Sequence, residues 1–346
     1  MILVTGGTGY IGTVLVQELL DLGHTVRVID TQWFGNRLRP TDRLEVLKGD
    51  LRYCEESWLA DVTSVLHLAG FSNDPTADFA PELNSACNVM ATRALARLVA
   101  RRATTEGLQI PFVFASTCSV YYTSTRTLDV NIQQMTEDLP VAPSSNYSKT
   151  KRLAEIELLR LADQNPGFCP VILRKGTVFG VSPRMRFDLV VNTFVLDAWR
   201  HRTLTVHGHG EVWRPLLHIR DAVDAYVYLL FTPVESMRGE IFNLVHKNYR
   251  ILELAHWVAE VLEQHRNISV RVKRDRSGAN GVRSYYVSGC KIAEKLSFRP
   301  ARGTTEAILA IWDGLERGDY GPNPAEESEY FNILRLKKGL SLAAAS

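Results

Sequence analysis

Short apolar runs alternate with longer amphipathic stretches through the first half of the chain. The apolar runs have the length of buried strands. They fall at residues 2–5, 25–30, 44–48, 64–68, 111–115 and 170–174. The stretches between them carry apolar positions three and four apart, the spacing of helices that pack by one face. These helices are expected at residues 11–22, 81–104 and 147–163. The alternation predicts an α/β fold built on a doubly wound parallel sheet.

The alternation fades after about residue 175, where segments punctuated by Gly and Pro appear. Helical spacing returns in four stretches, at residues 189–201, 219–230, 251–264 and 304–317. We therefore expect a first domain at residues 1–175, which holds the parallel sheet, and a smaller mixed α/β C-terminal lobe at residues 176–336. Residues 337–346 are expected to form a mobile tail.

Composition narrows the class of protein. The 346 residues, 45% of them hydrophobic, can bury one large core or two medium ones. The 40 basic residues are scattered among 38 acidic ones, and this balance predicts no nucleic-acid partner. Five widely spaced cysteines indicate free thiols and no metal site, and no stretch reaches the roughly 20 apolar residues of a membrane span. We therefore expect a cytoplasmic protein without a membrane partner.

Glycines at positions 6, 9 and 12 mark the junction of the first predicted strand and the first predicted helix. Glycines at this spacing let the chain turn tightly, let backbone N–H groups approach a pyrophosphate, and let the helix pack closely on the sheet. A strand before them and a helix after them make this a Rossmann dinucleotide-binding loop. The expected cofactor-binding residues of the loop are Gly6, Gly9, Tyr10, Ile11 and Gly12.

Asp30 closes the second predicted strand, about 20 residues beyond the glycines, at the distance expected of the ribose-binding acid. A carboxylate there accepts hydrogen bonds from the adenosine ribose hydroxyls and repels a 2′-phosphate, so the sequence favours NAD over NADP. Arg37 and Arg39 leave NADP open if their loop folds back over the site.

Two further strand ends belong to the nucleotide side. Asp50 and Leu51 follow the third strand, where we expect the adenine edge of the site. Leu68, Ala69 and Gly70 follow the fourth strand, where we expect the diphosphate. Either segment alone is an ordinary strand end, and only their order after the glycine loop makes them candidates for cofactor binding.

Tyr147 and Lys151 stand four residues apart in a predicted helix, one turn from each other on the same face. An ammonium beside a phenol stabilises the phenolate, and a bound nicotinamide cation adds to this effect. Both lower a pKa that starts at about 10, so that Tyr147 becomes a general base. On its own this spacing is typical of a surface pair, and the glycine loop upstream is what favours the catalytic interpretation.

A third group is needed to orient the reacting alcohol or carbonyl. The strand predicted at residues 111–115 ends in the hydroxyl residues Ser116, Thr117, Ser119 and Tyr121. All of them lie at the C-terminal edge of the predicted sheet, and composition does not choose among them.

Taken together, these residues resemble the extended short-chain dehydrogenases that act on nucleotide sugars, in order over roughly residues 1–260. The resemblance implies NAD as cofactor, a nucleotide-sugar substrate, and a homodimer formed through the helices that carry Asn88 and Tyr147. It also implies that Asn88 belongs to the cofactor site, and that Thr117 is the catalytic hydroxyl and contacts the substrate.

The resemblance continues into the C-terminal lobe. It implies that Val178 lies beside the nicotinamide, that Arg214 binds the diphosphate of the sugar nucleotide, and that Asn192 contacts a phosphate or the sugar. Thr177 stands where the family usually has Asn, among the substrate contacts. The segments at residues 71–75 and 183–187 are loosely similar to a subgroup from pathways of unusual activated sugars, including heptoses and deoxysugars.

The shared first step of the family would have Tyr147 remove the C4 hydroxyl proton while C4 gives its hydride to NAD. Relatives that eliminate water or carbon dioxide carry an acid within two positions after the catalytic hydroxyl, and this chain has Cys118 and Ser119 there. The sequence therefore favours a 4-epimerase. A C4 dehydrogenase or 4-ketoreductase, a 4,6-dehydratase and a non-catalytic dinucleotide-sensing Rossmann protein stay open as alternatives.

Overall fold

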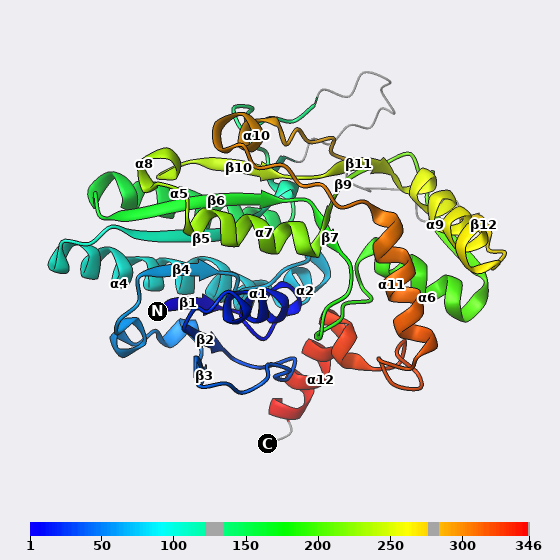
Figure 1. Cartoon of the computed structure of the whole chain (residues 1–346), viewed down its shortest axis with the longest axis horizontal. Helices are drawn as coiled ribbons and strands as arrows, with labels where there is room; N and C mark the ends of the chain where they lie inside the picture. The colour runs from blue at the N-terminus through cyan, green and yellow to red at the C-terminus, as the bar shows by residue number, and fades with distance from the viewer. Residues whose placement is uncertain (122–133, 276–283, 345–346) are drawn as a thin grey trace.

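The computed structural model of the chain describes residues 1–121, 134–275 and 284–344. Its centre is a seven-stranded parallel sheet in the order β10-β6-β5-β4-β1-β2-β3 (Figure 1). The strands are β1 (Ile2–Thr5), β2 (Val26–Asp30), β3 (Leu44–Lys48), β4 (Ser64–His67), β5 (Ile110–Thr117), β6 (Phe168–Lys175) and β10 (Ile241–Leu244). The predicted α/β fold with a doubly wound parallel sheet is confirmed.

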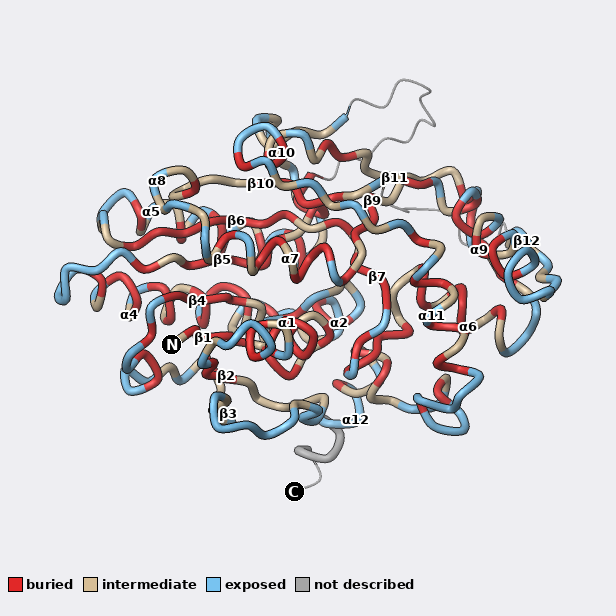
Figure 2. The backbone as a smooth tube through the Cα atoms, in the orientation of Figure 1, coloured by how far each residue is buried: buried red, intermediate tan, exposed pale blue. Residues whose placement is uncertain are grey.

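Helices cover both faces of this sheet, which explains why its strands are apolar on both sides. One face packs against α1 (Tyr10–Asp21) and α7 (Ile219–Leu230), and the other against α4 (Ala91–Glu106) and α5 (Asn146–Gln164) (Figure 1). Figure 2 shows the result as a band of buried backbone through the middle of the molecule. Shorter helical segments connect the strands. They are η1 (Leu51–Tyr53), η2 (Glu56–Leu59), α2 (Asp74–Phe79), α3 (Pro81–Ser85), the π-helical η3 (Ala86–Met90) and η4 (Cys118–Tyr121).

The C-terminal lobe is a mixed α/β structure, as the sequence predicts. Its strands form two small sheets, in the orders β11-β9-β7 and β12-β8. They are β7 (Thr177–Phe179), β8 (Thr203–His207), β9 (Trp213–His218), β11 (Lys247–Arg250) and β12 (Arg271–Asp275). The helices are α6 (Val190–His201), α8 (Val234–Met237), α9 (Ile251–Arg266), α10 (Cys290–Leu296), α11 (Thr304–Glu316) and η5 (Ser328–Tyr330).

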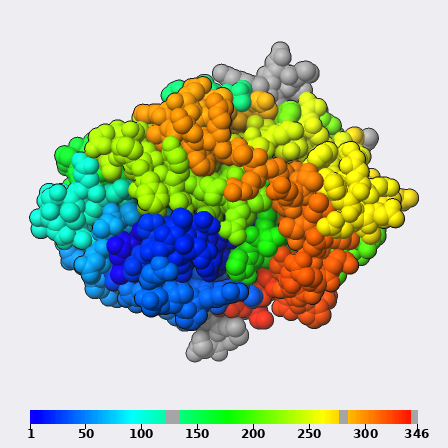
Figure 3. All heavy atoms as spheres, in the orientation of Figure 1, coloured from blue at the N-terminus to red at the C-terminus, as the bar shows by residue number. Residues whose placement is uncertain are grey.

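Two features of the C-terminal half were not foreseen. The four-residue strand β10 leaves that half and pairs with β6 at the edge of the central sheet, so the lobes interleave beyond residue 175. Helix α12 (Asn332–Ala344) covers most of the stretch predicted as a mobile tail, whose residues 345–346 lie outside the described part. Figure 3 shows the red C-terminal residues against the blue N-terminal ones at the edge of the molecule. The division into domains at residue 175 stays a prediction.

None of the helices in the described ranges combines the length and the apolar character that a membrane span requires.

Candidate active site

A cavity of about 440 Å³ opens at the carboxyl edge of the central sheet, between the two lobes. Sites at this edge are expected for an open parallel sheet. Of all the predicted site residues, only Asn88 and Asn192 do not line the cavity. The structure thus brings the predicted nucleotide end and the predicted chemical end into one space.

At the nucleotide end, the glycine loop is packed backbone against backbone. A Cβ built on Gly12 would lie 2.2 Å from the Gly6 carbonyl oxygen, and one on Gly6 would lie 2.6 Å from the Ala69 nitrogen. Gly6 also has a φ of +73°, which side chains rarely adopt. This tight loop before the N-terminus of α1 fits the diphosphate of a dinucleotide, since backbone N–H groups and the helix end both favour an anion there.

The acids at this end are held by their own neighbours. Asp30 accepts hydrogen bonds from the backbone N–H groups of Thr8 (3.1 Å) and Gln32 (2.8 Å), which fixes its carboxylate at the end of β2. Burial raises the pKa of Asp30. Asp50 accepts two side-chain bonds from Arg52, at 3.0 and 2.6 Å to one oxygen. Asp30 is therefore placed to meet ribose hydroxyls, while Asp50 is already engaged with a guanidinium.

At the chemical end, Tyr147 and Lys151 project from the first turns of α5. Ser145 and Ser148 form a reciprocal capping box that fixes where this helix begins. The Lys151 ammonium donates to the Ala115 carbonyl (3.0 Å) and lies 4.9 Å from the centre of the Phe114 ring. Burial lowers the pKa of Lys151 to about 8.

Lys151 does not by itself produce the expected fall in the pKa of the Tyr147 phenol. Burial raises the pKa of Tyr147, and the Thr117 side chain is the main group that opposes the rise. The physical reason is that Lys151 donates to a backbone carbonyl, while the phenol is enclosed by apolar neighbours such as Phe71 and Leu336. A phenol buried in this way needs positive charge nearby before it can give up its proton.

A buried ion pair fixes α5 against the sheet. Arg174 on β6 donates to both carboxylate oxygens of Glu155 on α5, at 3.0 and 2.7 Å, and both side chains are almost fully buried. Ser116 on β5 donates to the same carboxylate. Because Glu155 lies one turn beyond Lys151, this contact fixes the position of α5 relative to the ends of the strands.

Asn88 and Asn192 do not line the cavity, but their side chains hydrogen-bond to residues in its wall or beside it. The Asn88 amide accepts from the Phe71 N–H (2.8 Å) and donates to Thr150 on α5 (3.2 Å). The Asn192 amide accepts from the Gly180 N–H (3.1 Å) and donates to the Tyr10 hydroxyl (3.1 Å). Both amides have protein partners in this structure, and the direct ligand contacts implied by the resemblance stay a prediction.

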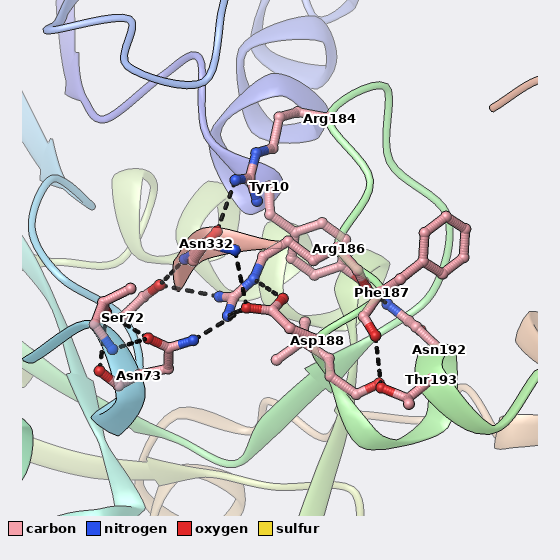
Figure 4. A network of polar contacts seen from close by, with 12 residues as sticks. Tyr10, Ser72, Asn73, Arg184, Arg186, Phe187, Asp188, Asn192, Thr193 and Asn332 are labelled. Atoms are coloured by element: carbon pink, nitrogen blue, oxygen red, sulfur yellow. Dashed lines mark hydrogen bonds and ion pairs between the residues drawn. The ribbon is translucent and has the colours of Figure 1, made fainter. Parts of the chain in front are cut away.

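Figure 4 shows a polar network beside the cavity that sequence reasoning missed. Arg186 and Asp188 form a two-bond ion pair (2.8 and 2.9 Å), and Arg186 also donates to the Ser72 hydroxyl (3.0 Å). Asn332 joins this group: its side chain donates to Ser72 (3.0 Å) and accepts from Arg184 (2.6 Å). The two segments singled out by their similarity to an unusual-sugar subgroup, residues 71–75 and 183–187, are therefore in direct contact.

The remaining cavity wall comes from the edge of the second lobe. Thr177, Val178 and Arg214 line it as expected, and the Arg214 guanidinium lies 5.2 Å from the centre of the Tyr285 ring. Lys175 at the end of β6 and Asp74 at the start of α2 also line the cavity, although neither was predicted as a site residue. Neither residue can be assigned to the site until the fold brings the end of β6 and the start of α2 to the same cavity.

Comparison with known proteins places this site in a family. The sequence profile of the NAD dependent epimerase/dehydratase family matches residues 2–244. The chain belongs to that family. It is accordingly an NAD-dependent enzyme, and the family predicted from the sequence is confirmed.

Curated relatives in the family differ in their reactions. UDP-glucuronic acid decarboxylase 1 of Xenopus tropicalis is 27% identical over 245 residues, which are 68% of this chain and 54% of that protein. An uncharacterized UDP-glucose epimerase of Bacillus subtilis is 32% identical over 259 residues, 70% of this chain and 76% of that protein. The chain spans between 54% and 62% of the length of the decarboxylases that it matches.

Solved structures of family members share the fold. UDP-glucuronic acid 4-epimerase from Bacillus cereus, in complex with UDP-glucuronic acid and NAD, matches with a TM-score of 0.75 at 24% identity, over 91% of this chain and 99% of that one. UDP-glucose 4-epimerase from Thermotoga maritima matches with a TM-score of 0.76 at 22% identity, over 91% and 98%. At these identities the likeness is one of architecture.

Proposed function

We propose that this chain is a nucleotide-sugar 4-epimerase, which oxidises the sugar at C4 and reduces it again from the opposite face. The observation that carries the proposal is the gathering of Tyr147, Lys151 and Thr117 at one end of a cavity whose other end is the glycine loop. Relatives named as 4-epimerases of UDP-glucose and UDP-glucuronic acid support it.

Each of the three side chains has a separate task. Tyr147 takes the proton of the C4 hydroxyl and later returns it. Thr117 orients the same oxygen from the end of β5, and Lys151 supplies positive charge beside the phenol. NAD held at the glycine loop and Asp30 supplies the hydride acceptor for C4. Turning the oxidised sugar over before the hydride returns inverts C4.

A C4 dehydrogenase or 4-ketoreductase would use the same residues and release the oxidised sugar. A 4,6-dehydratase needs a further acid or base. The positions after Thr117 offer none, because Cys118 is buried and Ser119 is hydrogen-bonded to Thr117 (3.1 Å). Asp74 favours the dehydratase as a second candidate, since it lines the cavity and its charge raises the pKa of Tyr147.

Product analysis separates these reactions. Purified protein is incubated with NAD and, in turn, UDP-glucose and UDP-glucuronic acid, and the products are identified by nuclear magnetic resonance and mass spectrometry. The proposal expects a product of unchanged mass with inverted C4. A product that has lost water or carbon dioxide, or net accumulation of reduced cofactor, would contradict it. A protein that only senses the dinucleotide would give no product.

We also propose that the chain forms a homodimer through α4 and α5. Met90, Leu153 and Ile156 on or beside these helices are 63%, 51% and 44% exposed, so the surface offers apolar area for a partner. Light scattering at micromolar concentration should give the mass of two chains. A strictly monomeric mass would reject this assembly.

A further inference from the structure

Lys175 stands beside the catalytic hydroxyl, one strand away. It is the last residue of β6, and its register partner on the neighbouring parallel strand β5 is Thr117. Adjacent strands lie about 4.8 Å apart, and paired residues point to the same face. Lys175 and Thr117 both line the cavity. The lysine is therefore within reach of a substituent on the ring carbon next to C4.

The amine of Lys175 is held from the protein side by a neutral group. Its Nζ donates to the Tyr226 hydroxyl (2.9 Å) and lies 5.5 Å from the centre of that ring. Tyr226, on α7, is fully buried and cannot carry a negative charge cheaply, since burial raises its pKa. Among the described residues, no carboxylate pairs with Lys175, and the charged group that acts on it most is Lys151.

The Lys175 amine has no anionic partner among the described residues. Burial, and then the charge of Lys151, lower the pKa of Lys175 well below its ordinary value. The cavity wall near the sugar end carries Lys151, Lys175 and Arg214, whereas the lining acids Asp30 and Asp50 belong to the adenosine end. Basic side chains therefore outnumber acidic ones at the sugar end, where Asp74 is the lining acid.

We propose that Lys175 binds a carboxylate carried by the sugar at the carbon next to C4, so that the preferred substrate is a nucleotide uronate. The inference rests on the proposed function, because it assumes that the C4 hydroxyl lies against Tyr147 and Thr117. In this arrangement Arg214 binds the diphosphate of the ligand. Tyr226 fixes Lys175 so that its remaining N–H donors face the cavity. An incoming carboxylate supplies an anionic partner for Lys175 and raises its pKa, which favours the ammonium form.

The test compares two ligands that differ only at this carbon. UDP-glucuronic acid and UDP-glucose are titrated calorimetrically into the NAD-loaded protein. The unmodified protein should bind the uronate at least about tenfold more tightly, the size of one charge-assisted hydrogen bond. Lys175→Met should remove this preference, and Tyr226→Phe should weaken it. Lys247→Met is the matched control, because Lys247 also lies on a tyrosine ring (4.8 Å from Tyr249) but is exposed and away from the cavity.

The outcomes separate this inference from the function on which it rests. Equal affinity for the two ligands, or an unchanged preference in Lys175→Met, overturns the inference alone. Binding of neither ligand contradicts the nucleotide-sugar function, and the inference with it. If Lys175→Met does not fold, Tyr226→Phe decides in its place. Titrations in two buffers of different ionisation enthalpy add a second readout: uronate binding should take up a proton, and UDP-glucose binding should not.

Discussion

The two ends of the cavity are held by different kinds of contact. At the nucleotide end, backbone meets backbone, and a single added carbon on Gly12 would overlap the Gly6 carbonyl. At the sugar end, buried charged side chains pair with each other, as in Arg174–Glu155 between β6 and α5 and Arg186–Asp188 within one segment. The first end tolerates no change of shape. The second depends on its buried ion pairs staying intact, because a charge left without its partner in the interior is costly.

The largest effect is expected at the sugar end, from Tyr147→Phe. The change keeps the ring and its packing but removes the group that takes the C4 proton. Hydride transfer, followed by rapid-mixing absorbance of the reduced cofactor, should fall by at least about a hundredfold, the usual contribution of a positioned general base. NAD affinity and the unfolding curve should stay close to those of the unmodified protein.

Thr117→Val is the comparison for this variant. A water can partly replace an orienting hydroxyl, and a neutral hydrogen bond contributes on the order of 1 kcal/mol, so the loss of rate should be smaller. Near-normal turnover in Tyr147→Phe together with an inactive Thr117→Val would show that the phenol is not the base.

Buried charge at the same end predicts a dependence of stability on pH. The pKa of Lys151 is about 8 in the folded protein against an ordinary 10.5, so between these values the unfolded chain binds more protons. The destabilisation from Lys151 is therefore fully present below pH 8 and is relieved as the pH rises toward 10.5. It amounts to on the order of 3 kcal/mol.

Urea unfolding at about pH 7 and about pH 10 measures this destabilisation. Lys151→Met is the reference, because it lacks the ionisable amine. The unmodified protein should gain unfolding free energy relative to the variant between the two pH values. Parallel behaviour of the two proteins would mean that the ammonium is not destabilised by burial.

The nucleotide end is tested by Gly12→Ala. The new methyl would lie 2.2 Å from the Gly6 oxygen, so the loop must shift, at a cost of about 1–3 kcal/mol, and NAD affinity should fall with it. Gly339→Ala in α12 is the control, because nothing lies within 4 Å of its added carbon. Alanine there should stabilise the helix by roughly 0.5–1 kcal/mol. Equal effects of the two changes would argue against a backbone-packed loop.

The smallest effect is expected where the two ends are joined, at Asn332. Asn332→Ala removes the acceptor of Arg184 and the donor to Ser72, at a cost of about 1–2 kcal/mol. Because Asn332 and Leu336 line the cavity, bound NAD should also leave several times faster, measured by displacement with a fluorescent analogue. The exposed Asn323→Ala is the control. Identical release from both variants would show that α12 does not help to hold the cofactor.

The same contrast explains what the sequence could predict. The strands at residues 2–5 and 44–48, the glycine loop and the Tyr147–Lys151 pair depend on neighbours in sequence, and their expected positions match the structure. Asn332 hydrogen-bonds to residues that lie 144 to 260 positions earlier in the chain, and such contacts leave no pattern in the neighbouring sequence. Strand β10 lies in the C-terminal half, where the alternation of strands and helices has faded, so its four residues have no regular context that marks them as a strand of the central sheet.

Asn88 and Asn192 show a different limit. The resemblance located both side chains near the site, but a position in a motif does not say which partner uses the amide. Here Phe71 and Gly180 take their amide oxygens, so both residues support the walls of the cavity.

Deuterium at C4 of the nucleotide sugar tests transient C4 oxidation most directly. The labelled substrate is incubated with the NAD-loaded protein in ordinary water, and the product is examined by nuclear magnetic resonance. Hydride transfer to and from the cofactor predicts an epimer that keeps its deuterium at C4 and forms more slowly than from unlabelled sugar. An epimer whose C4 label has been lost to solvent would contradict it, because the hydrogen would then have left as a proton.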